Sequence, residues 1–393
     1  MIAAEDCSSV IKAYDAQGWH RTATTVDHAS AQWLIDELGT RNVQGALETF
    51  PFTRVDPEPC SVQGDGWTIQ GYPFTDSLLP SPGNPLKGRF AERPGTGAFA
   101  LVRADAHGMA SPIDPLREQP WAAIIAILDG PGFTLRNQWR QDEPYGPPVV
   151  QVPASSAAQL ERARQSGEEL TIHCGAVHAP TEASNVIATV PGSDPSLAPI
   201  TVLTPRSGWW HCAGERGGGI AVWLEVAGEA RRLDLSRTVN FVASTGHELN
   251  FWGARQYVAR HPGVGPASRF WVHLGANIGA RGTTLMAVSS DLGLLDVARS
   301  AGDRSGMTAD EVRWEFREHA PGGEAQVIER AGGTFLSLIG ANFELFHSTE
   351  DRWPQAIDSE AIARAANLVV ETLLASEPGG GPGQSAPPSS SRG

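Results

Sequence analysis

Short apolar runs of strand length alternate with helical segments in the second half of the chain, and no other feature limits its fold as strongly. The apolar runs stand at residues 185–190, 200–204, 239–243, 269–274 and 335–339. Helical patterns occupy residues 219–231, 253–260 and 359–375. Strands that alternate with helices are typical of a sheet covered on both faces. We therefore predict an α/β fold with a mostly parallel central sheet flanked by helices.

The first half of the chain has a different pattern. Pro and Gly interrupt short alternating runs there, which is typical of a small β-rich unit. A chain of 393 residues is also longer than a single core usually supports. We predict a discontinuous α/β domain at residues 1–52 and 154–376, with a small β-rich domain inserted at 53–153. Residues 377–393 are mostly Gly, Pro and Ser, which predicts a disordered tail.

Composition narrows the range of partners. The chain carries 30 Lys and Arg against 44 Asp and Glu, a net charge of −14, which argues against nucleic-acid binding. No stretch approaches the roughly 20 apolar residues that span a bilayer, and the N-terminus lacks a signal-peptide pattern. We expect a cytoplasmic protein without a membrane partner. Its four scattered cysteines are expected to be free thiols. The sequence leaves the oligomeric state open, and a homo-oligomer is compatible with it.

The strand pattern at residues 239–243 runs directly into a turn that carries His247 and Glu248. Open α/β sheets bind ligands at the carboxyl ends of their strands. Both side chains can transfer protons or bind metals, so they are the first candidates for a functional site.

The order of several motifs resembles the clan MH metallopeptidases, which include leucyl-type aminopeptidases and glutaminyl cyclase. The family has an Asn-Val-Ile-Ala strand that leads to Pro-Gly, as residues 185–192 do here. A His-x-Asp strand end, an Ala-x-Asp-Asn-x-x-Gly turn, a Glu-Glu turn, an Asn-Leu-Asp strand end and a late His follow in the family. Corresponding positions occur here in the same order between about residues 183 and 375. The resemblance implies a zinc-aminopeptidase-like fold, and the inserted unit resembles a protease-associated domain.

The chain departs from this family at the first of the two metal positions that the resemblance implies. Pro205, Arg206 and Ser207 stand where the family has His-x-Asp. His273, Leu274 and Gly275 stand where it has Asn-Leu-Asp. Pro205 and Gly275 offer no side-chain ligand, so a two-metal peptidase is not expected.

The second metal position keeps a complete set of ligands by the same resemblance: Glu215, Glu248 and His347. Three protein ligands with an open fourth position are typical of a catalytic zinc site. We expect one divalent metal there, with zinc as the first expectation. Two carboxylates and an imidazole also suit manganese or iron.

Further residues on the same loops are candidates for catalysis and substrate binding. His247 occupies the family's general-base position and could relay a proton. Arg206 and Arg216 could orient an anionic group. Three residues between them are candidates for substrate binding: Trp209, Trp210 and His211. Packing for the two Trp side chains, and ordinary hydrogen bonding for His211, are the alternatives.

The sequence therefore favours a metal-dependent hydrolase of the aminopeptidase type, with one metal, that cleaves an amide or related acyl bond. The expected substrate is a small molecule or a short peptide. One alternative is a non-catalytic homologue that serves as a binding or assembly module. Another is a metal-dependent lyase or cyclase, because one metal and a base also serve elimination and intramolecular attack.

Overall fold

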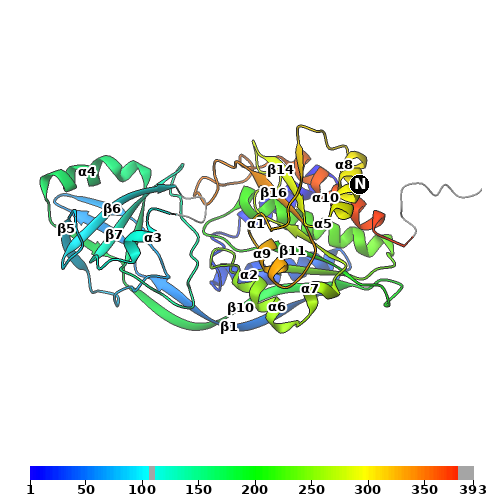
Figure 1. The fold of residues 1–393 in the computed structure, drawn as a ribbon, viewed down its shortest axis with the longest axis horizontal. Coiled ribbons are helices and arrows are strands. Elements are labelled where there is room, and N and C mark those ends of the chain that lie inside the picture. Colours follow the sequence, from blue (N-terminus) through cyan, green and yellow to red (C-terminus); the bar gives the residue numbers. More distant parts are fainter. Residues whose placement is uncertain (106–110, 379–393) are drawn as a thin grey trace, which may run out of the picture.

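The computed structural model describes residues 1–105 and 111–378, so the predicted tail lies almost entirely outside the described residues. Two eight-stranded sheets organise the described residues (Figure 1). In spatial order, the main sheet consists of β1 (Gly45–Pro57), β10 (Ala176–Val190), β12 (Val239–Ser244), β11 (Ile200–Pro205), β13 (Phe270–Leu274), β16 (Phe335–Ala341), β14 (Thr284–Ser289) and β15 (Val312–Phe316). The predicted α/β fold is confirmed.

The four central strands of the main sheet, β12, β11, β13 and β16, run parallel. Antiparallel pairs flank them, because β10 pairs antiparallel with β12 and β14 does so with β16. Every residue of β11 and β13 is buried, as expected for strands covered on both faces. Strands β14 and β15 and the helix between them were not predicted from the sequence.

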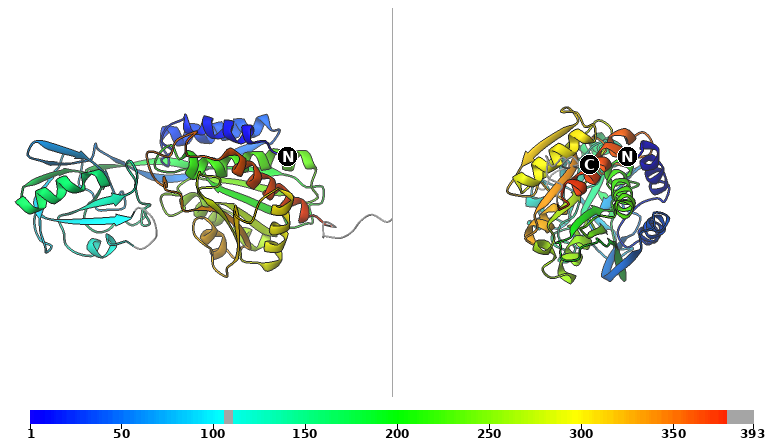
Figure 2. Two further views of the ribbon diagram at one scale, coloured as in Figure 1. Left: turned by 90° about the horizontal axis from the view of Figure 1, so that it is seen from above. Right: turned by 90° about the vertical axis from the view of Figure 1, so that its right-hand side faces the viewer.

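Helices cover both faces of the main sheet (Figure 2). One face packs against α2 (Thr25–Thr40), α5 (Gly218–Leu233) and α8 (Leu292–Arg304), and α1 (Ala4–Asp15) and α10 (Ser359–Ala375) pack on these helices on the same side. The other face packs against α6 (Trp252–Arg260), α7 (Val264–Ala267) and α9 (Ala325–Arg330). Among the described residues, no helix combines the length and the apolar character that a bilayer crossing requires.

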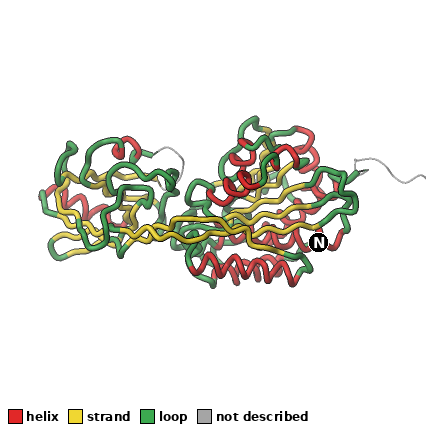
Figure 3. The backbone as a smooth tube through the Cα atoms, turned by 90° about the horizontal axis from the view of Figure 1, so that it is seen from below, coloured by secondary structure: helices red, strands yellow, loops and turns green. Residues whose placement is uncertain are grey.

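A second sheet with its own core forms the inserted unit. In spatial order its strands are β3 (Trp67–Gln70), β2 (Ser61–Gly64), β9 (Leu170–His173), β5 (Leu86–Phe90), β6 (Ala98–Asp105), β7 (Ala123–Asp129), β8 (Val149–Pro153) and β4 (Tyr72–Pro73). Its helical segments are α3 (Asp114–Arg117), η1 (Ala154–Ser156) and α4 (Ala157–Ser166). Strands β1 and β10 run side by side from one sheet to the other (Figure 3).

The end of the inserted unit differs from the predicted boundary at residue 153. Strand β9 pairs with β2 and β5, and α4 packs Leu160 into the core of the second sheet. Residues 154–175 therefore lie with the second sheet. The predicted boundary coincides with the end of β8, whereas the helix and the strand that follow it pack on the second sheet.

We expect that residues 58–175, as bounded by the structure, can be removed without unfolding the main domain. Pro57 lies opposite Ala176 in the β1–β10 ladder, so an Asn-Gly turn can join them after deletion of residues 58–175. This variant should be soluble and unfold cooperatively in circular dichroism. Deletion of 53–153 should give aggregated protein, because it exposes apolar side chains of α4 and β9. Equal solubility of the two variants would contradict the boundary.

Candidate active site

A cavity of about 300 Å³ opens where the parallel strands of the main sheet end. Its apolar lining includes Trp139, Phe251, Ile339 and Phe346. Its polar lining includes Asn137, His247, His273, Asn277, Glu324 and His347. Apolar walls with a few converging polar groups are typical of small-molecule sites.

His247 lies at the cavity beside a carboxylate that was not predicted from the sequence. Its Nδ1 lies 2.9 Å from Oε1 of Glu324. The other oxygen of Glu324 lies 3.5 Å from Nε2 of His273, whose Nδ1 is 2.8 Å from Ser337 Oγ. Burial alone would raise the pKa of Glu324, but the charges and hydrogen bonds of the two histidines outweigh it and hold the pKa below its usual range. Glu324 is therefore an ionised partner for His247.

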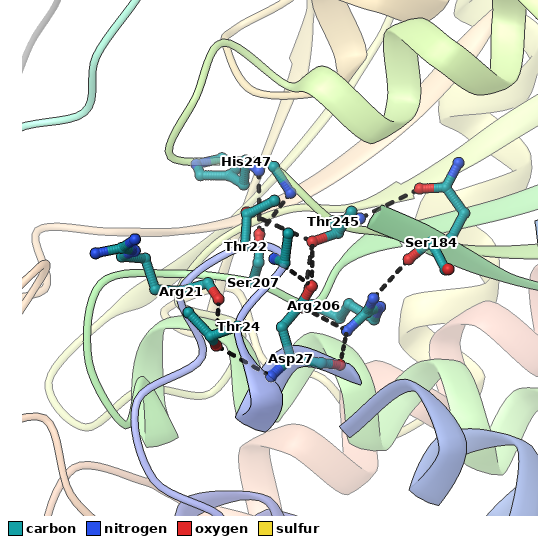
Figure 4. Close-up of polar contacts among 12 residues, drawn as sticks. Arg21, Thr22, Thr24, Asp27, Ser184, Arg206, Ser207, Thr245 and His247 are labelled. Carbon is teal, nitrogen blue, oxygen red and sulfur yellow. Dashed lines mark hydrogen bonds and ion pairs between the residues drawn. The ribbon is translucent and has the colours of Figure 1, made fainter. Parts of the chain in front are cut away.

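Glu248, a predicted metal ligand, turns toward the N-terminal segment. Its Oε1 accepts hydrogen bonds from Thr22 N at 2.8 Å and from Thr22 Oγ1 at 2.6 Å. Its Oε2 accepts one from Ser207 Oγ at 2.7 Å. The Ser207 hydroxyl also accepts hydrogen bonds from the backbone N–H groups of Gly246 and His247 (Figure 4). Both oxygens of Glu248 are thus engaged in a buried network.

Glu215 and His347, the other two predicted ligands, do lie together. His347 Nε2 is 3.5 Å from Glu215 Oε1, and its backbone N–H donates to Glu215 Oε2 at 3.3 Å. Glu215 Oε1 also lies 2.6 Å from Nη2 of the buried Arg216. Burial would raise the pKa of Glu215, but the charges of Arg216 and His347 lower it overall.

The predicted metal ligands do not fit a metal in this arrangement. Within residues 1–105 and 111–378, no three His, Cys, Asp or Glu side chains are placed to hold a metal ion. Glu215 and His347 meet, whereas Glu248 is held by Thr22 and Ser207. A zinc ligand needs a lone pair directed at the ion about 2.0–2.2 Å away, and Thr22 and Ser207 already take three of the roughly four lone-pair sites of Glu248.

Neither predicted arginine lines the cavity. Arg206 is fully buried in an ion pair with Asp27 at 2.7 Å and donates to the carbonyl of Ser184 (Figure 4). It therefore ties the start of α2 to strand β10. Arg216 follows Glu215 in the π-helical turn η2 (Ala213–Gly217), and its Nε donates to the Ser207 carbonyl at 2.9 Å.

The three residues predicted to bind substrate make hydrogen bonds to other segments of the chain. Trp209 Nε1 donates to Asn137 Oδ1 at 3.0 Å, and Trp210 Nε1 donates to the carbonyl of His347 at 2.9 Å. His211 Nδ1 lies 2.8 Å from the carbonyl of Asp15. These three residues do not line the cavity, and their contacts fit the packing and hydrogen-bonding alternatives.

The inserted unit contributes to the site through the loop that follows β7. Leu135 N donates to the carbonyl of His347 at 3.2 Å, and Gln138 N donates to that of Glu248 at 2.9 Å. Asn137 and Trp139 on this loop line the cavity. The sequence offered no signal for them, because their role depends on how two distant segments meet.

Comparison with known proteins identifies the fold. No protein-family profile matches the chain, and no curated protein matches it. Among solved structures, a zinc aminopeptidase from Bacillus subtilis is 17% identical with a TM-score of 0.79, with 96% of each chain covered. A peptidase M28 precursor from Shewanella amazonensis SB2B is 16% identical with a TM-score of 0.76, covering 95% of this chain and 94% of that one. An aminopeptidase from Aneurinibacillus sp. strain AM-1 is 15% identical with a TM-score of 0.71, covering 96% and 94%. The chain thus has the zinc-aminopeptidase fold along nearly its whole length.

The lowered pKa of Glu324 gives a pH-dependent prediction. A carboxyl group whose pKa is lower in the folded state stabilises the protein above its unfolded pKa of about 4.3, and this stabilisation is lost as the pH falls further. Glu324→Gln should lower the free energy of unfolding by about 1.5–3 kcal/mol at pH 7. The difference from the wild type should shrink below about pH 4.3. A difference that stays constant down to pH 3 in urea unfolding would contradict this role.

The buried pair of Arg206 and Asp27 predicts a structural effect. Arg206→Met leaves Asp27 as an uncompensated buried charge, so the free energy of unfolding should fall by about 3–5 kcal/mol. The matched control is Arg103→Met, which breaks an exposed pair with Asp129 and should change nothing measurable. Urea unfolding followed by tryptophan fluorescence measures both. Equal stability of the two variants would contradict the assignment.

Proposed function

We propose that this chain is a hydrolase that cleaves an amide or related acyl bond of a small molecule or short peptide, with His247 as the proton-transferring base. The observation that carries the proposal is the 2.9 Å contact between His247 Nδ1 and the buried carboxylate of Glu324 at the cavity. An imidazole oriented by a carboxylate is a recurrent arrangement for general-base catalysis. The zinc-aminopeptidase fold is consistent with a hydrolase but carries no activity by itself.

Glu324 sets the tautomer of His247. An ionised carboxylate beside Nδ1 holds the proton on that nitrogen, which leaves the lone pair on Nε2 as the acceptor. A water molecule bound to Nε2 would give up its proton as its oxygen attacks the carbonyl carbon. The imidazolium, stabilised by Glu324, would then donate that proton to the departing amine nitrogen.

The cavity offers groups for the remaining tasks. Asn137 lines it, and Trp209 holds its Oδ1, so the NH₂ group is the end that can donate to a substrate carbonyl oxygen. A hydrogen-bond donor placed where negative charge develops on the carbonyl oxygen lowers the barrier to acyl transfer. Trp139, Phe251 and Phe346 provide apolar surface for a side chain of the substrate.

Removal of the base should separate turnover from binding. His247→Gln and Glu324→Gln should each lower kcat by about 10²–10⁴-fold, because general-base catalysis contributes this much. Trp139→Phe, the control on the same cavity, should change KM more than kcat. Suitable probes are amino-acid anilides, N-acyl amino-acid amides and dipeptides, with products identified by mass spectrometry. Turnover unchanged in His247→Gln would contradict the proposal.

A binding module is the second candidate, favoured by the engagement of Glu248 with Thr22 and Ser207 in place of a metal. It predicts that members of the probe set quench tryptophan fluorescence at the cavity without being cleaved.

The metal-dependent hydrolase requires Glu248 to leave both partners and predicts about one zinc, manganese or iron ion per chain. A lyase or cyclase predicts products that contain no oxygen from labelled water.

A further inference from the structure

Arg216 carries a guanidinium that is fully buried among the loops at the strand ends. One side of it is fixed, since Nε donates to the Ser207 carbonyl at 2.9 Å and Nη2 lies 2.6 Å from Glu215 Oε1. Among the described residues, Nη1 and Nη2 have no hydrogen-bond partner of good geometry. The contact with Glu215 is thus mainly a contact between charges.

We propose that the guanidinium of Arg216 is the permanent cation of this site and takes the place of a divalent metal ion. It neutralises Glu215 and, through the Ser207 carbonyl, joins the π-helical turn before α5 to the loop after β11. Glu215 in turn meets the ring and the backbone N–H of His347. A single covalently attached cation therefore organises the loops that a metal would otherwise cross-link.

The distances argue against a metal ion beside this arginine. A zinc–oxygen bond is about 2.0–2.2 Å long, so an ion bound to Glu215 Oε1 would lie at most about 5 Å from Arg216 Nη2. Two cations at that separation in a buried site repel each other strongly. The one carboxylate also cannot neutralise both charges, and Glu248 is engaged with Thr22 and Ser207.

The first test measures metal in the intact wild-type protein. We expect far less than one zinc, manganese or iron ion per chain by elemental analysis after purification with added Zn²⁺ and desalting. The thermal midpoint should be the same in excess Zn²⁺ and in chelator. About one tightly bound ion per chain that is lost in Glu248→Ala would overturn the inference. These readouts do not involve turnover, so they stand or fall independently of the hydrolase proposal.

The second test addresses the ion pair itself. Arg216→Met should lower the urea midpoint strongly, because it leaves Glu215 buried without its counter-charge. The double variant Glu215→Gln with Arg216→Met should recover part of this loss, since it removes both charges. Arg164→Met, which breaks an exposed pair with Glu161, is the matched control and should leave the midpoint unchanged. An Arg216→Met midpoint equal to that of the wild type, or a double variant no more stable than the single one, would overturn the inference.

Discussion

Ser207 makes the interaction on which the arrangement of the site depends. Its hydroxyl donates to Glu248 and accepts from the backbone of Gly246 and His247, while its carbonyl accepts from Arg216. Ser207, in the loop that follows β11, therefore fixes both the loop after β12 and the turn before α5. All of these groups are buried, so each broken hydrogen bond would leave a desolvated polar atom and cost far more than an exposed one. The direction of His247 toward the cavity follows from this constraint.

The inserted unit contacts the same loops, although it has a core of its own. Backbone N–H groups of its loop after β7 donate hydrogen bonds to the carbonyls of Glu248 and His347, which lie on two different loops of the site. Isolated bridges between Thr134 and Ser348 and between Gln138 and Leu249 extend the contact. The cavity wall therefore belongs to both units, and the two-stranded connection of β1 and β10 sets how they meet.

The sequence predicted those parts of the structure that local patterns determine. Continuous apolar runs identified β11, β12 and β13, and the turn after β12 identified His247 as a cavity residue. The motif order also grouped Glu215 with His347, and the two side chains lie 3.5 Å apart.

It could not predict which way a buried side chain turns. Glu248 follows His247 directly, yet it is held by Thr22, a residue more than two hundred positions earlier. Glu324 stands outside every motif, in a turn before a short helix that carries no recognisable signal. Arg206 was a candidate for binding an anion, but Asp27 occupies its guanidinium. In each case the partner comes from a distant segment, so the side chain's role is set by tertiary contacts and not by spacing.

The site separates two tasks that a metal ion commonly combines. A catalytic metal both cross-links its loops and supplies charge to the reacting atoms. Here the Arg216–Glu215 pair lies behind the cavity wall, where it can hold loops together but cannot contact a ligand. The charge that faces the cavity is that of Glu324, and it acts through His247. Because the structural charges are already balanced within the protein, a ligand in the cavity meets a hydrogen-bonding imidazole and an apolar wall. Such a surface favours a neutral amide over a strongly charged ligand, since burial of a charge without a partner is costly.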